Sequence, residues 1–262
     1  MLESARIAAS DLLVACWEEG RRIDGLPDHL RPTTTLEGYA IQAELLRRTG
    51  SSLFGWKIAA TSKAGQQHIN VAGPLAGRIL AKNVRAERSA ISLQGNHMRV
   101  AEVEFAFKMK ADLPARAMTY RVEEVKAATG TLHPAIEVPD SRFEDFTRVG
   151  AAQLIADDAC AHLFVLGQAT PASWRDYDLS QQLVKATMAA KSDFQGTGAN
   201  VLGDPLVALT WLVNELSDLG VGLQAGEVVT TGTCVAPIPV APGDWISADF
   251  GPFGMIDISF SG

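Results

Sequence analysis

Apolar and polar positions repeat with two different periods along this chain, which predicts helices near its start and strands later. Apolar residues recur at helical spacing over residues 4–22 and again over Leu36–Arg48. We expect these two helices to form a small N-terminal helical layer over residues 1–52. The segment Phe54–Ala60 is the first predicted strand. The weakly patterned, polar stretch Thr61–Gly77 after it is predicted to be a mobile lid.

Residues 53–262 are predicted to form one catalytic domain. Helices are expected over Thr119–Thr129, over residues 151–162 and from Asp204 onwards, where Asp followed by Pro is typical of a helix start. The other predicted strands either alternate apolar and polar residues or consist of apolar residues throughout. They cover Leu132–Val138, His162–Leu166, Glu227–Val235, Trp245–Phe250 and Met255–Phe260. This mixture predicts an α+β fold with a large, curved β core.

Composition narrows the range of functions. The 262 residues are 47% hydrophobic and 20% charged, so a large core is expected and wholesale disorder is excluded. The net charge of −7 and the lack of a basic cluster argue against nucleic acid as a partner. No apolar run is long enough to span a bilayer, so no membrane partner is expected. Three widely separated cysteines suggest neither a zinc site nor a disulfide framework, and a cytoplasmic location fits them best.

Two glutamates one residue apart, Glu102 and Glu104, carry the clearest chemical signal. They lie in a predicted strand whose apolar residues, Val103 and Phe105, would face the other way, so the two carboxylates share one face. Neighbouring carboxylates repel unless a positive charge lies between them, and a hard divalent cation would supply one. A solvated Glu-x-Glu on an exposed sheet face is the alternative. A third carboxylate, Glu137, follows in the next predicted strand.

Five motifs, in one order along nearly the whole chain, resemble a known family. They are Gly-Trp-Lys-Ile-Ala-Ala-Thr-Ser-Lys (55–63), Ala-Glu-Val-Glu (101–104), Pro-Ala-Ile-Glu-Val-Pro-Asp-Ser-Arg (134–142), Val-Leu-Gly-Asp-Pro-Leu (201–206) and Leu-Gln-Ala-Gly-Glu-Val-Val-Thr-Thr-Gly-Thr (223–233). Together they resemble the 2-hydroxypenta-2,4-dienoate (2-keto-4-pentenoate) hydratase and 4-oxalocrotonate decarboxylase family of the fumarylacetoacetate hydrolase superfamily. The resemblance implies a mixed β-roll core with a small N-terminal helical layer.

The resemblance also implies a site. It implies a Mg²⁺ or Mn²⁺ ion held by Glu102, Glu104 and Glu137, and a small 2-oxo acid substrate that chelates the ion. Lys57 matches the family lysine, which points at the carboxylate or enolate of the substrate. A surface lysine at the end of a strand is the alternative. Thr233 matches a turn that presents donors to the substrate carboxylate, with a plain β-turn as the alternative.

Two positions depart from the hydratase pattern. Leu75 stands where the hydratases commonly carry an acidic residue, and leucine cannot move a proton. The lid segment offers His68 instead, and a histidine that titrates near neutral pH is suited to activating water. A polar lid residue without a catalytic role is the alternative for His68. Arg142 is predicted either to bind a distal carboxylate of the substrate or to pair with Glu144 or Asp145.

These departures set the order of the functional hypotheses. The preferred one is a metal-dependent C–C bond hydrolase that cleaves a 2,4-dioxo acid of the acylpyruvate or maleylpyruvate type, from aromatic-ring catabolism, and releases pyruvate. The alternative is a 2-hydroxypenta-2,4-dienoate hydratase-type lyase or a 4-oxalocrotonate-type decarboxylase. A third is a catalytically silent binding subunit. A homo-oligomer is expected, and a complex with another pathway enzyme is left open. The roles of Asp158 and Cys160 stay open as well.

Overall fold

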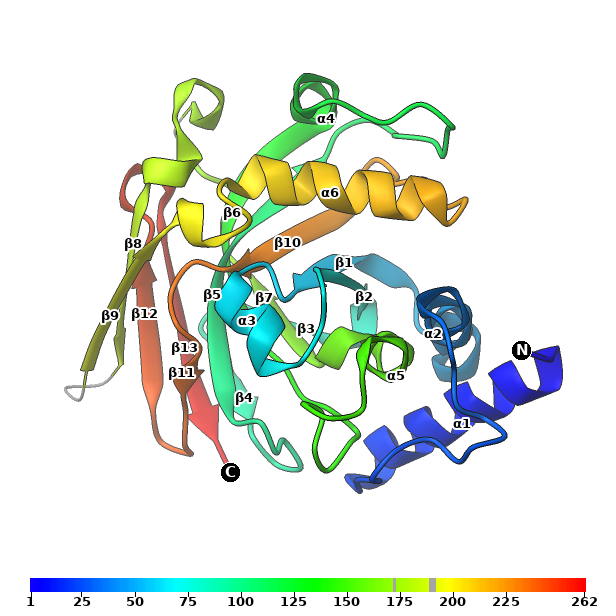
Figure 1. The fold of residues 1–262 in the computed structure, drawn as a ribbon. Coiled ribbons are helices and arrows are strands. Elements are labelled where there is room, and N and C mark those ends of the chain that lie inside the picture. Colours follow the sequence, from blue (N-terminus) through cyan, green and yellow to red (C-terminus); the bar gives the residue numbers. More distant parts are fainter. Residues whose placement is uncertain (172, 189–191) are drawn as a thin grey trace.

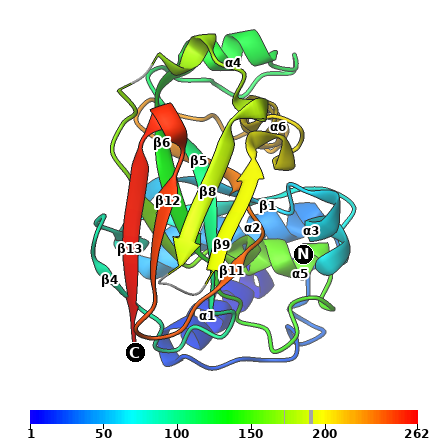
Figure 2. The same cartoon turned by 90° about the vertical axis from the view of Figure 1, so that its left-hand side faces the viewer.

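Two β-sheets form the body of this protein in a computed structural model that describes residues 1–171, 173–188 and 192–262 (Figure 1). The larger sheet has the strand order β2-β1-β10-β5-β6-β7-β3, and β11 pairs with β5 beside this path. The second sheet has the order β4-β13-β12-β8-β9. Figure 2 shows the long strands of the second sheet side by side on one flank of the molecule. The predicted α+β class with a curved, mixed β core is confirmed.

The bounds of the elements follow the chain order. The strands are β1 Leu53–Ala59, β2 Leu75–Leu80, β3 Val84–Arg85, β4 Ala90–Ser92, β5 Val100–Met109, β6 Thr129–Val138, β7 Leu163–Leu166, β8 Leu183–Met188, β9 Ser192–Thr197, β10 Val228–Thr233, β11 Ile238–Pro239, β12 Trp245–Asp249 and β13 Met255–Ser261. The α-helices are α1 Glu3–Glu19, α2 Thr35–Thr49, α3 Lys63–His68, α4 Val122–Ala128, α5 Ala151–Ala156 and α6 Pro205–Asp218.

The core joins the two sheets through β5. Val103, Phe105 and Phe107 on one face of this strand are fully buried, as the alternating pattern predicts. The ring of Phe105 lies edge-on to Phe250 and Phe253, with centroids 5.0 and 6.0 Å away, in the segment between β12 and β13. The opposite face of β5 carries Glu102 and Glu104 and then Ala106, which packs in a second apolar cluster with Ala135 and Val228.

The predicted N-terminal helices are confirmed as α1 and α2, and α2 ends as expected at Gly50, whose φ of 63° is the left-handed conformation that glycine favours. These helices pack on each other, and α2 also packs on α5, at one side of β1 and β2 (Figure 1). The Gln42 amide on α2 donates to the carbonyls of Ala76 and Ile155 at 2.9 and 3.0 Å. The helical layer is therefore hydrogen-bonded directly to β2.

The segment Thr61–Gly77, predicted to be a mobile lid, contains α3 and the first three residues of β2, a strand whose six residues are all buried. The mobility of this segment stays a prediction. The predicted helix over residues 151–162 ends at Ala156, because Asp158–Cys160 adopt left-handed backbone angles. Asp204 caps α6 as predicted, and its carboxylate accepts from the Leu206 N–H at 2.7 Å. No helix in the described part of the chain has the length and apolar character needed to cross a membrane.

Candidate active site

Four adjacent strands in the middle of the larger sheet carry the residues singled out from the sequence. Lys57 on β1 lies beside Thr230 on β10 in parallel register. On the other side of β10, Glu104 on β5 lies opposite Thr233. Glu102 on β5 lies directly opposite Glu137 on β6. Three strands, β1, β5 and β6, therefore bring one ammonium and three carboxylates to the same part of the sheet, and β10 lies between β1 and β5.

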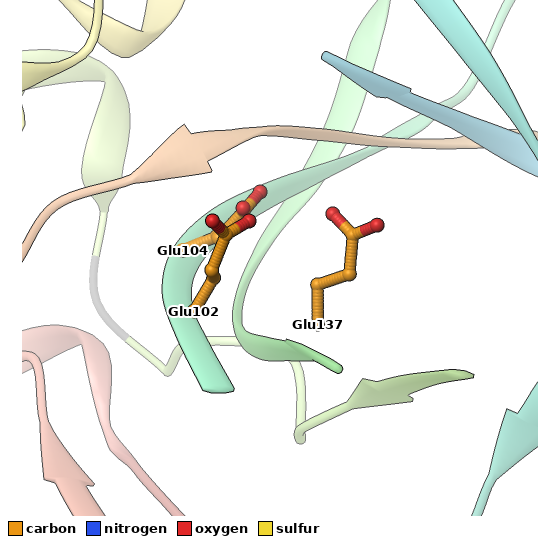
Figure 3. A group of neighbouring side chains, drawn as sticks. All are labelled: Glu102, Glu104 and Glu137. Carbon is orange, nitrogen blue, oxygen red and sulfur yellow. The ribbon is translucent and has the colours of Figure 1, made fainter. Parts of the chain in front are cut away.

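The three carboxylates Glu102, Glu104 and Glu137 form one cluster (Figure 3). One oxygen of each lies within 4.8 Å of the others. Glu104 is 0% and Glu137 2% exposed, while Glu102 is half-buried. A solvated Glu-x-Glu on an open sheet face is therefore excluded.

Lys57 is the counter-charge of this cluster. The residue is 2% exposed, and its ammonium lies 3.2 Å from Glu137 Oε1 and donates to the Ala159 carbonyl at 3.0 Å. The alternative of a surface lysine is excluded. Three carboxylates against one ammonium leave a formal charge of −2 in a buried place. That excess negative charge is costly without a further cation.

Burial dominates the electrostatics of the cluster. Loss of solvation raises the pKa of Glu102, and it raises the pKa of Glu137 well above the usual range despite the Lys57 ammonium. Burial and the Glu102 charge raise the pKa of Glu104 to about 7, although Thr230 and the Gly232 N–H bond to its carboxylate. The attraction of Glu137, Glu102 and Glu104 overcomes desolvation and raises the pKa of Lys57. The cluster thus resists full ionisation until another positive charge arrives.

The donor set fits a hard divalent cation. Glu104 Oε1 and Glu137 Oε2 are buried and have no hydrogen-bond partner among the described residues. The other oxygen of Glu104 is held by the Gly232 N–H at 2.8 Å and by the Thr230 hydroxyl. Metal–oxygen distances of about 2.1 Å for Mg²⁺ and about 2.4 Å for Ca²⁺ place two ligands no more than roughly 4–5 Å apart. Glu102, Glu104 and Glu137 would hold such an ion with small side-chain shifts.

A cavity of about 640 Å³ opens beside the cluster. Lys57, Glu102 and Thr233 line it, and so does His68 at the end of α3. The Thr233 hydroxyl donates to the Val235 carbonyl at 2.7 Å, so its oxygen is oriented by the chain that follows it. The structure therefore brings six of the seven predicted site residues to the cavity or to the carboxylate cluster at its wall.

His68 lies on the exposed rim of this cavity. Its ring packs edge-on to Phe146, with centroids 6.0 Å apart. No carboxylate of the described residues hydrogen-bonds to its imidazole. The support that a hydrolytic histidine would need is therefore missing from the described part of the chain.

Arg142 is the predicted site residue that the structure does not bring to the cavity. Its guanidinium is buried, pairs with Asp157 and donates to the carbonyls of Asp140 and Ala161 at 3.0 and 3.1 Å. It also stacks over the ring of Trp17 on α1, 4.6 Å from the ring centroid. The ion-pair alternative is correct in kind, but its partner is Asp157, not Glu144 or Asp145. Substrate binding by Arg142 is not supported by this position.

A left-handed turn behind Lys57 is a feature that the sequence did not reveal. Asp158, Ala159 and Cys160 have φ values of 57°, 50° and 63°, a conformation that costs about 1–2 kcal/mol for each non-glycine residue. The turn aims the Ala159 carbonyl at the Lys57 ammonium. The Asp158 carboxylate fastens it to β2 by accepting from the Arg78 N–H at 2.6 Å. The contact of Asp158 with β2 therefore holds the strained backbone of this turn in a conformation that positions the Lys57 ammonium.

Gly77 is required where β2 meets this turn. A Cβ at Gly77 would lie 2.4 Å from the Asp158 carbonyl oxygen and 2.9 Å from the Lys57 side chain. We expect Gly77→Ala to lower the free energy of unfolding by about 2–4 kcal/mol, since the backbone must shift. Gly73→Ala is the matched control, because its Cβ would meet nothing within 4 Å. Equal urea midpoints for the two variants would contradict the close contact.

Asp158 also predicts a pH effect on the metal-free protein. Burial raises the pKa of its carboxyl from 3.8 to about 7. The folded state then keeps a proton that the unfolded chain releases above about pH 4, so this group favours folding at low pH and opposes it increasingly up to about pH 7. Asp158→Asn keeps an acceptor for the Arg78 N–H and removes the charge.

The free energy of unfolding of Asp158→Asn, measured in urea and compared with that of wild type, should therefore rise between pH 5 and 7 by up to about 1.4 kcal/mol per pH unit. The exposed Asp28→Asn is the control, and parallel profiles for wild type and Asp158→Asn would refute the assignment.

The sequence is similar over nearly its full length to curated bacterial hydratases. It is 32% identical over 248 residues to 2-hydroxyhexa-2,4-dienoate hydratase of Comamonas testosteroni, covering 92% of each chain. It is 30% identical over 263 residues to 2-keto-4-pentenoate hydratase of Paraburkholderia xenovorans (strain LB400), covering 99% of this chain and 96% of that protein. No protein-family model matches the sequence.

The fold is similar to that of a solved decarboxylase. The 4-oxalocrotonate decarboxylase from Pseudomonas putida G7, in complex with magnesium and adipate, superposes with a TM-score of 0.90 at 26% identity, over 99% of this chain and 98% of that one. A fumarylacetoacetate hydrolase family protein from Yersinia pestis CO92 shares the fold at 14% identity with a TM-score of 0.58. The chain therefore belongs to the 2-keto-4-pentenoate hydratase family and has the fold of the fumarylacetoacetate hydrolase superfamily.

Proposed function

We propose that this protein is a divalent-metal-dependent lyase that adds water to a 2-hydroxy-2,4-dienoate and forms a 4-hydroxy-2-oxo acid. The observation that carries the proposal is the buried carboxylate cluster with two unpartnered oxygens, placed beside Lys57 on a cavity wall. Relatives at 30–32% identity that are named hydratases support the reaction class. A neighbouring structure that holds magnesium supports the kind of metal.

This proposal replaces the C–C bond hydrolase that the sequence favoured. That preference depended on His68 as a water-activating base and on the missing acid at Leu75. His68 lies on the rim without a carboxylate partner among the described residues, and the two relatives compared above are named hydratases. Both observations favour the lyase alternative over the hydrolase.

The reaction needs two proton movements and one addition. The dienol loses its 2-hydroxyl proton and gains a proton at C5, and water then adds its oxygen at C4 and a proton at C3. When bound, the divalent ion supplies Lewis acidity at the 2-oxygen and the neighbouring carboxylate. Lys57 lies where its ammonium can hold the negative charge that develops on the substrate. Thr233 on the same wall is the proposed contact of the substrate carboxylate.

Product analysis tests the proposal directly. Protein loaded with Mg²⁺ should consume 2-hydroxypenta-2,4-dienoate and release 4-hydroxy-2-oxopentanoate, followed by loss of the dienol absorbance and by NMR of the product. A 2,4-dioxo acid should release little pyruvate in the same assay. Faster pyruvate release than hydration would restore the hydrolase.

Decarboxylation is the second candidate. It is favoured by the TM-score of 0.90 to a 4-oxalocrotonate decarboxylase over 99% of the chain. Release of CO₂ from 4-oxalocrotonate, measured beside the hydration assay, separates the two. A higher kcat/KM for CO₂ release than for hydration would favour the decarboxylase.

His68 supplies a further prediction. We expect His68→Ala to lower turnover by less than about tenfold, because its ring is exposed and, among the described residues, makes one ring contact, with Phe146. A general base is worth roughly 10²–10⁴-fold. The measurement is kcat with the dienoate at saturating Mg²⁺, with Gln67→Ala on the same short helix as the control. A loss of 100-fold or more would show that His68 acts in the chemistry.

A further inference from the structure

We infer that Asp140, anchored by Arg22, is a positioning residue for the carboxylate cluster. Its contacts hold the end of β5 against the end of β6, where Glu102 and Glu137 lie opposite each other. The inference rests on the proposed metal site and goes beyond it, because neither Asp140 nor Arg22 belongs to the cluster or lines the cavity. It also gives a role to the Pro-Asp-Ser-Arg segment at 139–142, which follows the last strand residue of β6.

The ladder between β5 and β6 ends where the carboxylates lie. Glu102 opposite Glu137 is the last pair in the register of these two strands. Beyond this pair the chain before β5 and the chain after β6 both reach the cavity, through Met98 on one side and Pro139 on the other. Pairing of β5 with β6 therefore does not extend to the segments that flank the two carboxylates.

The Asp140 carboxylate joins these two flanking segments. Its Oδ1 accepts from the His97 N–H at 2.9 Å and from the Met98 N–H at 3.2 Å. Asn96 adds a second link, because its side-chain amide donates to the Pro139 carbonyl at 3.0 Å. These bonds continue the connection between β5 and β6 past the last strand pair, so they limit how far the two strand ends can move apart.

The backbone of Asp140 reaches the turn that binds Lys57. The Asp140 N–H donates to the Cys160 carbonyl at 2.9 Å. The adjacent Ala159 carbonyl accepts from the Lys57 ammonium at 3.0 Å. The Asp140 carbonyl accepts from the Arg142 guanidinium at 3.0 Å. Asp140 therefore links the ends of β5 and β6 to the left-handed turn behind Lys57.

Arg22 anchors Asp140 from outside the site. Its guanidinium pairs with Asp140 Oδ2 and donates to the Gly95 carbonyl at 2.9 Å, and both side chains of the pair are 3% exposed. The chain after α1 is held in place for this contact, because the Ile23 N–H donates to the Arg142 carbonyl at 3.1 Å. A buried charge that loses its partner is strongly disfavoured. Without Arg22 the Asp140 carboxylate would therefore turn toward water, and its bonds to the segment before β5 would weaken.

Metal affinity measures this positioning without turnover. In calorimetric titration of the metal-free protein with Mg²⁺, Asp140→Ala should bind the ion about tenfold or more less tightly than wild type. The reason is that contacts which orient metal ligands are typically worth about 10–100-fold in affinity. Asp140→Asn keeps an acceptor for the two N–H groups, and it should bind Mg²⁺ at least about threefold more tightly than Asp140→Ala.

Arg22→Met tests the anchor without changing a residue of β5 or β6. It should weaken Mg²⁺ binding by about threefold or more. Saturating Mg²⁺ should return its kcat to within about twofold of wild type, because all three carboxylates are intact. Wild-type Mg²⁺ affinity in folded Arg22→Met would overturn the inference, including the case in which Asp140→Ala is not obtained as folded protein.

Leu13→Ala is the control for a general loss of stability. Leu13 is 2% exposed in the separate apolar cluster of the N-terminal helices, so its truncation destabilises the same layer that carries Arg22. It should leave Mg²⁺ affinity at the wild-type value. An equal loss of affinity in Leu13→Ala and Asp140→Ala would show a general effect of stability and overturn the positioning role.

The metal proposal and this inference fail in different ways. Wild-type protein that binds neither Mg²⁺ nor Mn²⁺ would contradict the metal site, and the inference with it. Binding that is equally tight in wild type, Asp140→Ala and Arg22→Met would leave the metal site in place and overturn the positioning role alone. Loss of affinity in both variants, with wild-type affinity in Leu13→Ala, is the result that the inference expects.

Discussion

Glu104→Gln should lower kcat/KM by about 10³-fold or more while the protein stays folded. The glutamine keeps an acceptor for the Gly232 N–H and the Thr230 hydroxyl, so the local structure survives. It removes one of three carboxylates that fit a divalent ion, and with it the charge that holds the ion. The measurements are turnover at saturating metal and the metal affinity by calorimetry.

A stability measurement separates this effect from damage to the fold. In the metal-free protein at pH 8, Glu104→Gln should be at least as stable as wild type, since a buried, repelled charge is gone. Chelation should abolish wild-type activity, and Mg²⁺ or Mn²⁺ should restore it. The exposed Glu123→Gln serves as the control. Full activity in chelated wild-type protein, or in Glu104→Gln, would refute a metal role for this cluster.

Lys57→Met should lower kcat by about 10²-fold or more, because methionine fills the space but cannot stabilise negative charge on the substrate. It should also lower the free energy of unfolding of the metal-free protein by about 3–5 kcal/mol at pH 8, since Glu137 loses its buried partner. Added Mg²⁺ should stabilise this variant more than wild type.

The control for Lys57 is Lys63→Met, on the exposed side of α3. It should leave both kcat and unfolding close to wild type. Turnover in Lys57→Met equal to that in Lys63→Met would leave Lys57 a structural counter-ion only. A stability loss that Mg²⁺ cannot reduce would argue that the metal does not bind beside Glu137.

The parts of the site that could be predicted from sequence depend on local periodicity. The alternation around β5 gives both the buried face of Phe105 and the shared face of Glu102 and Glu104, because strand geometry alone fixes it. The helices α1, α2 and α6 follow from apolar spacing and from end signals such as Asp204 and Gly50. That Glu137 lies close to Glu102 and Glu104 could be predicted only from the family resemblance. It depends on the pairing of β5 with β6, which periodicity within each strand does not determine.

The parts that were missed depend on tertiary contacts. β2 is buried along its whole length, so its residues do not alternate, and no strand was predicted there. The left-handed turn at Asp158 exists because β2 and Lys57 hold it, and no residue in it is a glycine. Arg142 pairs with Asp157, fifteen positions later in the chain, because the tertiary fold brings the two side chains together, and no local sequence pattern indicates this pair. Phe146 and Leu154, which line the cavity, also come from separate segments that only the fold brings together.

The hydrogen bonds from α2 to β2 have a consequence for how this chain can be shortened or recombined. The Tyr39 hydroxyl accepts from the Ala76 N–H at 3.1 Å, and the Gln42 side-chain amide donates to the carbonyl of the same residue at 2.9 Å. Ala76 precedes Gly77, which lies against the Lys57 side chain. A truncation that removes α2 would remove one hydrogen bond from each of three backbone groups behind the site: the Ala76 N–H, the Ala76 carbonyl and the Ile155 carbonyl. Residues 35–49 should therefore be exchanged between homologues only together with β2, and libraries that shuffle the two independently should yield mostly inactive or insoluble chimeras.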